Sequence, residues 1–264
     1  MPDEILTAAV EIARTAGALA EARFRAGSPV SRKADGTEVT PADVEVERLI
    51  RRLVEQRFPG DQVYGEEEGG AGTVRAGRRW IIDPINGTTL FARQLPGFDV
   101  LIAVEQDGAP AVGVVHYPVT ATTYFAARGG GAWRQRGDQR PERLAVTART
   151  RLRGAAVGMH NPSTWSEQLL ATLHREVALM SWTSAGSGVA CGWLDAGVIA
   201  GHPMGYEDMA PLPVLITEAG GRVSDLAGGD LLPGAGDVLT SNGHLHDQLV
   251  ELVAGLPTGP RPHP

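Results

Sequence analysis

Four acidic residues lie where a strand or a helix is expected to begin or end: Asp43, Glu66, Asp83 and Asp208. Carboxylates at such positions can converge from distant parts of the chain. Hard divalent cations such as Mg²⁺ are held by one or two carboxylates together with phosphate oxygens and water. Each acid also has an ordinary structural explanation, because Asp43 and Asp208 suit helix caps and Glu66 begins a run of glutamates. A metal site therefore requires that they come together.

Residues 80–89, with the sequence WIIDPINGTT, form the most informative stretch. The apolar start predicts a buried strand. Asp83 and Pro84 are expected to end this strand with a turn, because proline fixes φ and lacks an N–H. An Asn-Gly pair predicts a second turn, after which Thr88 is expected to open a helix with exposed backbone N–H groups. An acid beside a helix N-terminus can hold a metal against a phosphate, although a turn with polar side chains also explains these residues.

The surrounding pattern indicates the elements that position these residues. In the first half, helices are expected at residues 3–25 and 41–58, the second with Thr40 as N-cap and Asp43 at N3. The strands expected there are 62–64, 80–82, 100–105, 111–116 and 122–127. The second half alternates strands (155–158, 180–183, 198–200, 223–224, 238–240) with helices (166–177, 187–194, 209–218, 245–254). We therefore predict an α/β protein with an α+β first half, 1–148, an α/β second half, 149–256, and a disordered proline-rich tail, 257–264.

The overall composition excludes several classes of protein. The chain has 264 residues, 42% of them hydrophobic and 21% charged, which is typical of a globular protein. The net charge of −7 argues against nucleic acid as a partner. The single cysteine rules out an intrachain disulfide. No signal peptide or membrane-length apolar run is visible, so we expect a cytoplasmic protein without a membrane partner.

Taken together, the acids and their neighbours resemble the inositol monophosphatase family of Mg²⁺-dependent, lithium-sensitive phosphatases. The matching segments are Val39–Asp43, Gly65–Glu67, Trp80–Thr89, Asp208, Thr217–Gly221 and Ser241–Gly243. They occur in family order and at family spacings, and the resemblance extends from residue 6 to residue 253. Residues 33–37 and 239–247 look most like the histidinol-phosphatase-like branch of this family.

The resemblance implies a layered αβαβα fold. It also implies a site that holds about two or three Mg²⁺ ions, similar to the two-metal sites of other phosphatases. The implied metal ligands are Glu66, Asp83, the Ile85 carbonyl, Asn86 and Asp208. Asp43 and Glu66 would reach a further metal through water, and Thr88 with Glu66 would orient the attacking water. The implied substrate contacts are the N–H groups of Gly87 and Thr88, with Thr89, Gly186, Ser187 and His202. The expected partner is a small phosphorylated metabolite, and a homodimer is expected from the family.

Asn86 departs from the family pattern, which has aspartate at this position. A neutral amide should weaken the second metal site. Three explanations remain open. The chain is a phosphatase that is slow or needs a high Mg²⁺ concentration, it is an engineered variant that traps its ligand, or it uses the fold for another function. The first predicts hydrolysis of a sugar, polyol or amino-alcohol phosphate. The others predict a family member that binds a phosphorylated ligand without efficient turnover.

Residues 197–208 form a second departure. When it is aligned with the family pattern, this run is shorter by about three residues. It lacks the usual turn aspartate and has Glu207 where tryptophan is usual. Inositol and histidinol phosphates therefore both become weaker candidates as the substrate. His202 could contact a substrate, although an exposed loop histidine is an equal explanation, and His244 and His246 are expected at the surface.

Overall fold

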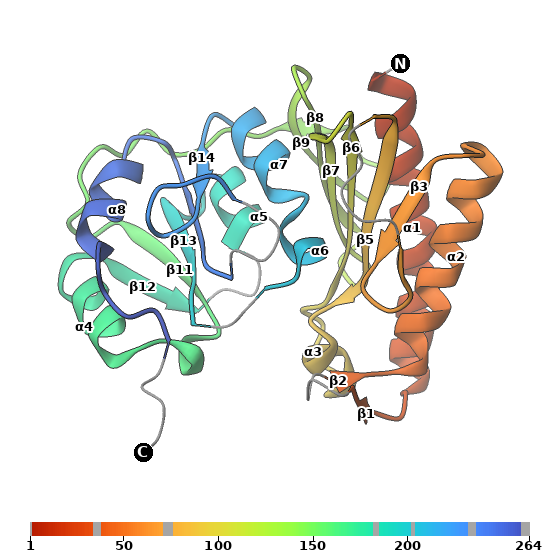
Figure 1. Cartoon of the computed structure of the whole chain (residues 1–264), viewed down its shortest axis with the longest axis horizontal. Helices are drawn as coiled ribbons and strands as arrows, with labels where there is room; N and C mark the ends of the chain where they lie inside the picture. The colour runs from red at the N-terminus through yellow and green to blue at the C-terminus, as the bar shows by residue number, and fades with distance from the viewer. Residues whose placement is uncertain are drawn as a thin grey trace. The chain divides into compact units, whose positions relative to one another are not determined.

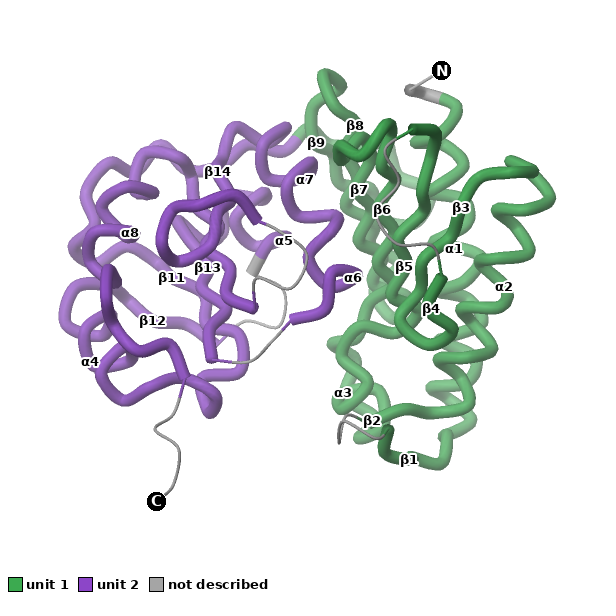
Figure 2. The backbone as a smooth tube through the Cα atoms, in the orientation of Figure 1, with its two compact units in different colours: residues 1–143 green, residues 144–264 purple. Residues whose placement is uncertain are grey.

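The computed structural model describes residues 2–33, 38–70, 76–181, 185–201, 204–231 and 236–259. The chain forms two compact units, residues 1–143 and 144–264 (Figure 2). The predicted boundary, between residues 148 and 149, lies slightly later in the chain. Within the part of the chain that the structure describes, no helix has the length and apolar composition needed to cross a membrane.

Unit 1 is built on an eight-stranded sheet with the order β10-β9-β8-β7-β6-β5-β3-β4. Its strands are β3 (Gln62–Gly65), β4 (Gly69–Gly70), β5 (Arg78–Asn86), β6 (Asp99–Gln106), β7 (Ala109–Tyr117), β8 (Thr122–Ala127), β9 (Gly131–Arg136) and β10 (Glu142–Arg143). Strands β3 and β5 are parallel, and the other neighbours pair antiparallel. A separate antiparallel pair is formed by β1 (Ser31–Arg32) and β2 (Glu38–Val39).

Helices α1 (Pro2–Ala26) and α2 (Pro41–Arg57) lie side by side on one face of this sheet (Figure 1). Val46, Ile50 and Val54 recur at every fourth position of α2, so they form one apolar stripe. This stripe packs into a core that includes Trp80 and Ile82 of β5. The packing fixes α2, whose first turn carries Asp43, relative to β5.

Unit 2 is built on a five-stranded sheet with the order β12-β11-β13-β15-β14. Its elements are β11 (Ala156–His160), η1 (Pro162–Thr164), α4 (Glu167–Glu176), β12 (Ala178–Ser181), α5 (Ala185–Ala190), β13 (Ala196–Ile199), α6 (Tyr206–Met209), α7 (Leu212–Glu218), β14 (Arg222–Ser224), β15 (Val238–Ser241) and α8 (His246–Val253). Val198 packs with residues of α4 and α8, whereas its neighbour Ile199 packs with Met209 and Leu212. Consecutive strand residues point to opposite faces, so helices cover both faces of this sheet.

Strand β5 is longer than predicted. It was expected to end at Asp83 and Pro84, but it continues to Asn86. The ladder with β6 shifts its register between Asp83 and Asn86, so Pro84 lies in a β-bulge. A bulge leaves a residue outside the regular hydrogen-bond ladder, and a proline without an N–H is tolerated there.

The helix predicted at residues 209–218 is also different, because it is divided into α6 and α7. The division falls at Pro211, which is the N-cap of α7. A proline inside a continuous helix would remove a hydrogen bond and clash with the preceding turn. As a result, Asp208 is the third residue of the separate short helix α6 rather than a residue that precedes a long one.

One expectation about the C-terminal part is wrong, and another is tested only in part. His246 is fully buried, and its ring nitrogens contact Ser241 Oγ at 2.9 Å and Ser224 Oγ at 2.8 Å. His244, in contrast, is exposed as predicted. At the start of the tail predicted to be disordered, Ser166 donates hydrogen bonds to the carbonyls of Pro257 and Thr258. Residues 260–264 lie outside the described part of the chain.

Candidate active site

Asp43 serves both the start of α2 and the candidate site, with a different oxygen for each. Its Oδ2 accepts hydrogen bonds from Thr40 N at 2.8 Å and Thr40 Oγ1 at 2.6 Å, which completes the predicted capping box. Its Oδ1 lies 3.3 Å from Thr88 Oγ1. Asp43 is fully buried, and burial raises its pKa. Hydrogen bonds from Thr40 oppose this rise, and the nearby charge of Glu66 adds to it.

The bulge in β5 explains why the Asp-x-x-Asn spacing can build a site. Asp83 faces Leu101 of β6, and Asn86 faces Asp99. Cross-strand partners share a face of the sheet, and residues two apart on β6 also share a face. Asp83 and Asn86 therefore project to the same face, although three positions in a regular strand would separate them. Pro84 and the bulge are thus part of the site geometry.

A tight turn after the bulge gathers further oxygen atoms. Asp83 Oδ1 accepts a hydrogen bond from Ile85 N at 3.1 Å. Thr88 Oγ1 lies 3.2 Å from Ile85 O, in addition to its contact with Asp43. The Ile85 side chain is buried in the helix-covered core, so this residue contributes to the site through its carbonyl.

Gly87 begins the predicted helix, α3 (Thr88–Ala92). Its φ of +85° is in the left-handed region, where a side chain would be strained. The first turn of α3 has N–H groups without intrahelical acceptors, as at any helix start. Of the two threonines, Thr88 points its hydroxyl toward Asp43, whereas the exposed Thr89 donates a hydrogen bond to Glu38 at 2.8 Å.

Glu66 follows β3 in a turn whose backbone is hydrogen-bonded to a side chain of α2. The fully buried Glu47 accepts hydrogen bonds from the backbone N–H groups of Glu67 at 2.7 Å and Glu68 at 3.0 Å. Arg51 also donates to Glu47, at 2.7 Å through Nη2. A side chain at Gly65 would lie 2.4 Å from the Glu47 carboxylate, so this position needs glycine for close packing.

Lys33 lies over the two glutamates of this turn. Its ammonium contacts Glu66 Oε1 at 2.9 Å and Glu67 Oε1 at 2.7 Å. Burial alone would lower the pKa of Lys33, but the bonds to Glu67 and Glu66 raise it above its ordinary value. Burial raises the pKa of Glu67 to about 7, against the effect of Lys33, and the charges of Glu66 and Asp43 add to the rise.

Asn86 makes a hydrogen bond to another acid. Its Nδ2 donates to Asp99 Oδ1 at 2.9 Å. Asp99 is 2% exposed, and burial raises its pKa to about 7. Hydrogen bonds from Asn86 and Tyr117 oppose this rise.

The other predicted site residues belong to unit 2. Asp208 accepts a hydrogen bond from Gly205 N at 2.7 Å at the start of α6. Gly186 lies in α5, where a side chain would be 2.3 Å from Leu212, and the neighbouring Ser187 is buried. His202 lies outside the described residues.

Sequence reasoning did not assign four residues that shape this site: Lys33, Glu47, Glu67 and Asp99. Glu47 had a detectable signal, because an acid one turn after Asp43 lies next to the apolar stripe of α2. Asp99 also had one, since it directly precedes a run of five apolar residues, 100–104. Lys33 and Glu67 depend on contacts between segments far apart in the chain, which spacing does not reveal.

The oxygen donors suit a hard cation, although the acids alone do not complete a metal site. Within the described residues, no group of three His, Cys, Asp or Glu side chains converges closely enough to hold a metal ion. The predicted donors include a carbonyl and an amide, at Ile85 and Asn86, which are oxygen ligands of the kind that Mg²⁺ accepts. Burial is the main cause of the raised pKa values of Asp43 and Glu67, and the negative charge of neighbouring acids adds to both.

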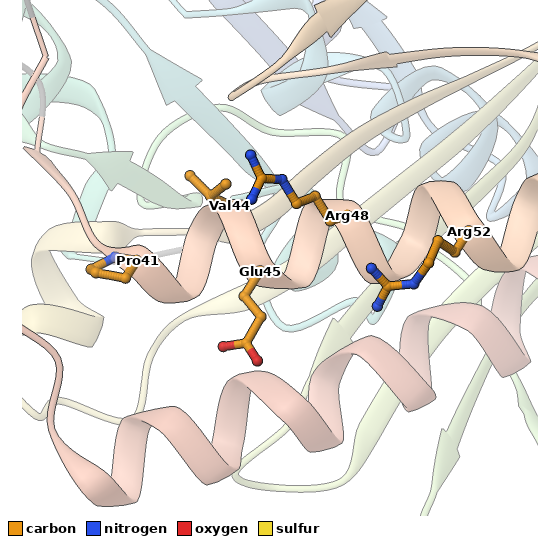
Figure 3. A pocket seen from close by; sticks show the side chains of 5 residues that line it. All are labelled: Pro41, Val44, Glu45, Arg48 and Arg52. Carbon is orange, nitrogen blue, oxygen red and sulfur yellow. The ribbon is translucent and has the colours of Figure 1, made fainter.

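A hollow beside α2 is a different feature (Figure 3). It has a volume of about 570 Å³ and is lined by Pro41, Val44, Glu45, Arg48 and Arg52. All five residues come from one helix, and none is a predicted site residue. The carboxylate cluster around Asp43, rather than this hollow, is therefore the candidate site.

Comparison with known proteins identifies the family. The sequence model of the inositol monophosphatase family matches residues 1–257. The chain belongs to the inositol monophosphatase family. It is accordingly a phosphatase of the phosphoric monoester hydrolase class, and the predicted family and enzyme class are confirmed.

Individual relatives cover nearly the whole chain. A histidinol-phosphatase from Mycobacterium tuberculosis is 37% identical over 97% of this chain and 100% of its own length. An inositol-1-monophosphatase from Rhizobium meliloti is 31% identical over 85% of each chain. The structure of an inositol monophosphatase from Anabaena superposes with a TM-score of 0.80 and 26% identity over 97% of each chain. The predicted α/β fold of this family is therefore confirmed.

Proposed function

We propose that the chain hydrolyses the phosphate monoester of a small sugar, polyol or amino alcohol in a Mg²⁺-dependent reaction. The observation that supports this most directly is the meeting of the Thr88 hydroxyl with Asp43 and the Ile85 carbonyl. A hydroxyl that can orient water lies there beside hard oxygen donors. Inositol monophosphatase family enzymes are generally metal-dependent, typically with Mg²⁺.

The proposed Mg²⁺ ligands in unit 1 are Glu66, Asp83, the Ile85 carbonyl and Asn86. Asp208 is proposed as a further ligand on the resemblance alone. When bound, about two or three Mg²⁺ ions would neutralise the phosphate and make coordinated water more acidic. Lys33 would have to release Glu66 in part, because one of its oxygens is engaged by the ammonium.

The protein groups would position the reactants as follows. Thr88 Oγ1 donates its one proton to Asp43 or to the Ile85 carbonyl, so its lone pairs can accept a hydrogen bond from a water molecule. Glu66 would orient the same water, and Asp43 would assist through a further water. Water then attacks phosphorus in line with the ester oxygen, the ester P–O bond breaks, and the proton passes to the leaving alkoxide. The products are inorganic phosphate and an alcohol.

The phosphate oxygens would be bound by the N–H groups of Gly87 and Thr88, which lack helical acceptors. Thr89 is a weaker candidate for this role, because its hydroxyl is bonded to Glu38. Gly186, Ser187 and His202 are proposed on the resemblance as contacts for the remainder of the substrate.

The alcohol part of the substrate is proposed by class only. Relatives named histidinol-phosphatase and inositol-1-monophosphatase favour an amino alcohol or a polyol. Residues 197–208 depart from the family pattern, however, so the acid that usually contacts the substrate is missing from its place. A homodimer, expected from the family, is part of the proposal and is tested by sedimentation.

Phosphate release from a panel of esters tests the function. The panel includes histidinol phosphate, inositol 1-phosphate and sugar phosphates, with Mg²⁺ titrated to high concentration. We expect Asp83→Ala to abolish Mg²⁺ binding and hydrolysis, whereas the exposed Asp138→Ala should retain both. If no ester is hydrolysed by the chain, nor by a variant with an acid restored at position 86, phosphatase activity on such esters is rejected.

A second candidate is a family member that binds a phosphorylated ligand with little turnover. The observation that favours it is Asn86, a neutral amide that is already bonded to Asp99. Calorimetry with the same esters separates the two candidates. Tight binding of an ester without phosphate release would support the second.

A further inference from the structure

Asn86 and Asp99 form a cross-strand pair that the sheet itself holds in place. They are direct partners in the β5–β6 ladder, at the end of the bulge. Asn86 Nδ2 donates to Asp99 Oδ1 at 2.9 Å, and the Tyr117 hydroxyl on β7 bonds the same carboxylate. Three neighbouring strands therefore contribute to one hydrogen-bonded group.

The position of Asp99 needs a physical explanation. All residues of β6 from Asp99 to Glu105 are buried, and most are apolar. A carboxylate that is 2% exposed loses its hydration, which is costly unless it is paired and hydrogen-bonded. The partners of Asp99 are Asn86 and Tyr117, both neutral. The acid therefore acts here as a hydrogen-bond acceptor for Asn86 and not as the partner of a buried cation.

The hydrogen bond determines which end of the Asn86 amide is used. The two ends of an amide differ, since the nitrogen is a donor and the oxygen an acceptor and possible metal ligand. With Nδ2 directed at Asp99, Oδ1 is directed away from it. Without this bond the amide could rotate and present a donor, which repels a cation.

We propose that Asp99 is a positioning residue that holds the Asn86 amide by its nitrogen and so presents Oδ1 as a metal ligand. The inference rests on the proposed function, in which Asn86 is a ligand of Mg²⁺. It also explains how the chain can use an amide where the family has aspartate. Position 86 has no acid, but Asp99 on the adjacent strand provides one that contacts the proposed metal ligand Asn86.

Mg²⁺ affinity, measured by calorimetry without substrate, tests this role. Asp99→Ala should weaken Mg²⁺ binding by about ten- to a hundredfold, the usual effect of losing a residue that orients a metal ligand. Asp99→Asn should stay within about threefold, because an amide oxygen can still accept from Asn86 Nδ2. Asp138→Ala, which removes an exposed acid of unit 1, is the matched control and should bind Mg²⁺ like the unchanged protein.

A double-mutant cycle separates positioning from general structure. In an Asn86→Ala background, Asp99→Ala should have no further effect on Mg²⁺ affinity, because Asp99 acts through the amide. Thermal unfolding without Mg²⁺ shows whether each variant is folded. If Asp99→Ala does not fold, Asp99→Leu, which also lacks an acceptor for the Asn86 amide, takes its place and should show the same loss of Mg²⁺ affinity. A loss of tenfold or more in Asp99→Asn, about 1.4 kcal/mol, overturns the proposal.

The results also separate this inference from the proposed function. Unchanged Mg²⁺ affinity in Asp99→Ala, or the same loss in both backgrounds, overturns the positioning role and leaves the phosphatase proposal intact. The expected Mg²⁺ affinities without hydrolysis of any ester would support positioning and reject the proposed function. Absence of Mg²⁺ binding to the unchanged protein would overturn both.

Discussion

At the scale of single residues, the important feature of this site is the position of its acidic side chains. Asp43 divides its two oxygens between the capping box and Thr88. Asn86 replaces a carboxylate that the family usually has, and Asp99 is its direct partner. A substitution at position 86 therefore cannot be understood without position 99.

Restoring the acid at position 86 is expected to have opposite effects in two backgrounds. Asn86→Asp alone puts two carboxylates in direct contact where a hydrogen bond now joins them. We expect it to destabilise the metal-free protein by about 1–3 kcal/mol, from the lost bond and the like charges. Asn86→Asp with Asp99→Asn should recover most of this stability, because an amide at position 99 can donate to the new acid.

Urea unfolding without Mg²⁺ measures both changes. Equal stability of the single and double variants would contradict the coupling between the two positions.

At the scale of elements, the candidate site depends on how β5 ends and on how α2 begins. The sequence predicted the capping box at Thr40, because its residues are local and each has a strong preference. It did not predict that β5 passes through Pro84, since proline normally ends a strand. The pairing with β6 decides that point, and pairing between strands is not encoded in local spacing. For the same reason Asp99 fell just outside the predicted strand 100–105, and Glu47 was expected only as a residue of the helix 41–58.

Glu47 is the element-scale test of how α2 holds the Glu66 turn. Glu47→Gln keeps the shape but leaves one acceptor oxygen, so it cannot satisfy both the N–H groups of the turn and Arg51. We expect a loss of about 1–3 kcal/mol in unfolding free energy and a lower rate of phosphate release. Glu45→Gln, on the exposed side of the same helix, should cost less than about 1 kcal/mol. Equal effects of the two substitutions would show that the turn is held by other contacts.

At the scale of the whole molecule, the described residues of each unit include one buried histidine that makes folding stability depend on pH, His116 in unit 1 and His246 in unit 2. Burial lowers the pKa of His116 in unit 1 to about 4, with a smaller effect from Arg14. Burial lowers the pKa of His246 in unit 2 to about 4, and Arg222 adds to this effect. An unfolded histidine titrates near about 6.5. Below that pH the unfolded chain binds protons that the folded chain does not, so each histidine contributes stability that is lost as pH falls toward 4.

Glu67 and Asp99 act in the opposite sense. Their pKa values are raised to about 7, so they favour the folded state at low pH and cost stability as pH rises through 7. Their effect cancels when a histidine variant is compared with the unchanged protein at each pH. The difference in unfolding free energy therefore isolates the histidine.

Replacing either buried histidine should therefore change the slope of the unfolding free energy against pH by a similar amount. Between pH 5 and 6, His116→Asn and His246→Asn should each reduce the slope of unfolding free energy by about 1.1 kcal/mol per pH unit, because the unfolded imidazole binds about 0.8 proton more than the folded one. His174→Asn, which removes an exposed imidazole in unit 2, is the matched control for the loss of a histidine at the surface. Urea unfolding at several pH values in this interval measures the slopes. If His246→Asn keeps the original slope, His246 is protonated in the folded state, and its two serine contacts do not keep it neutral.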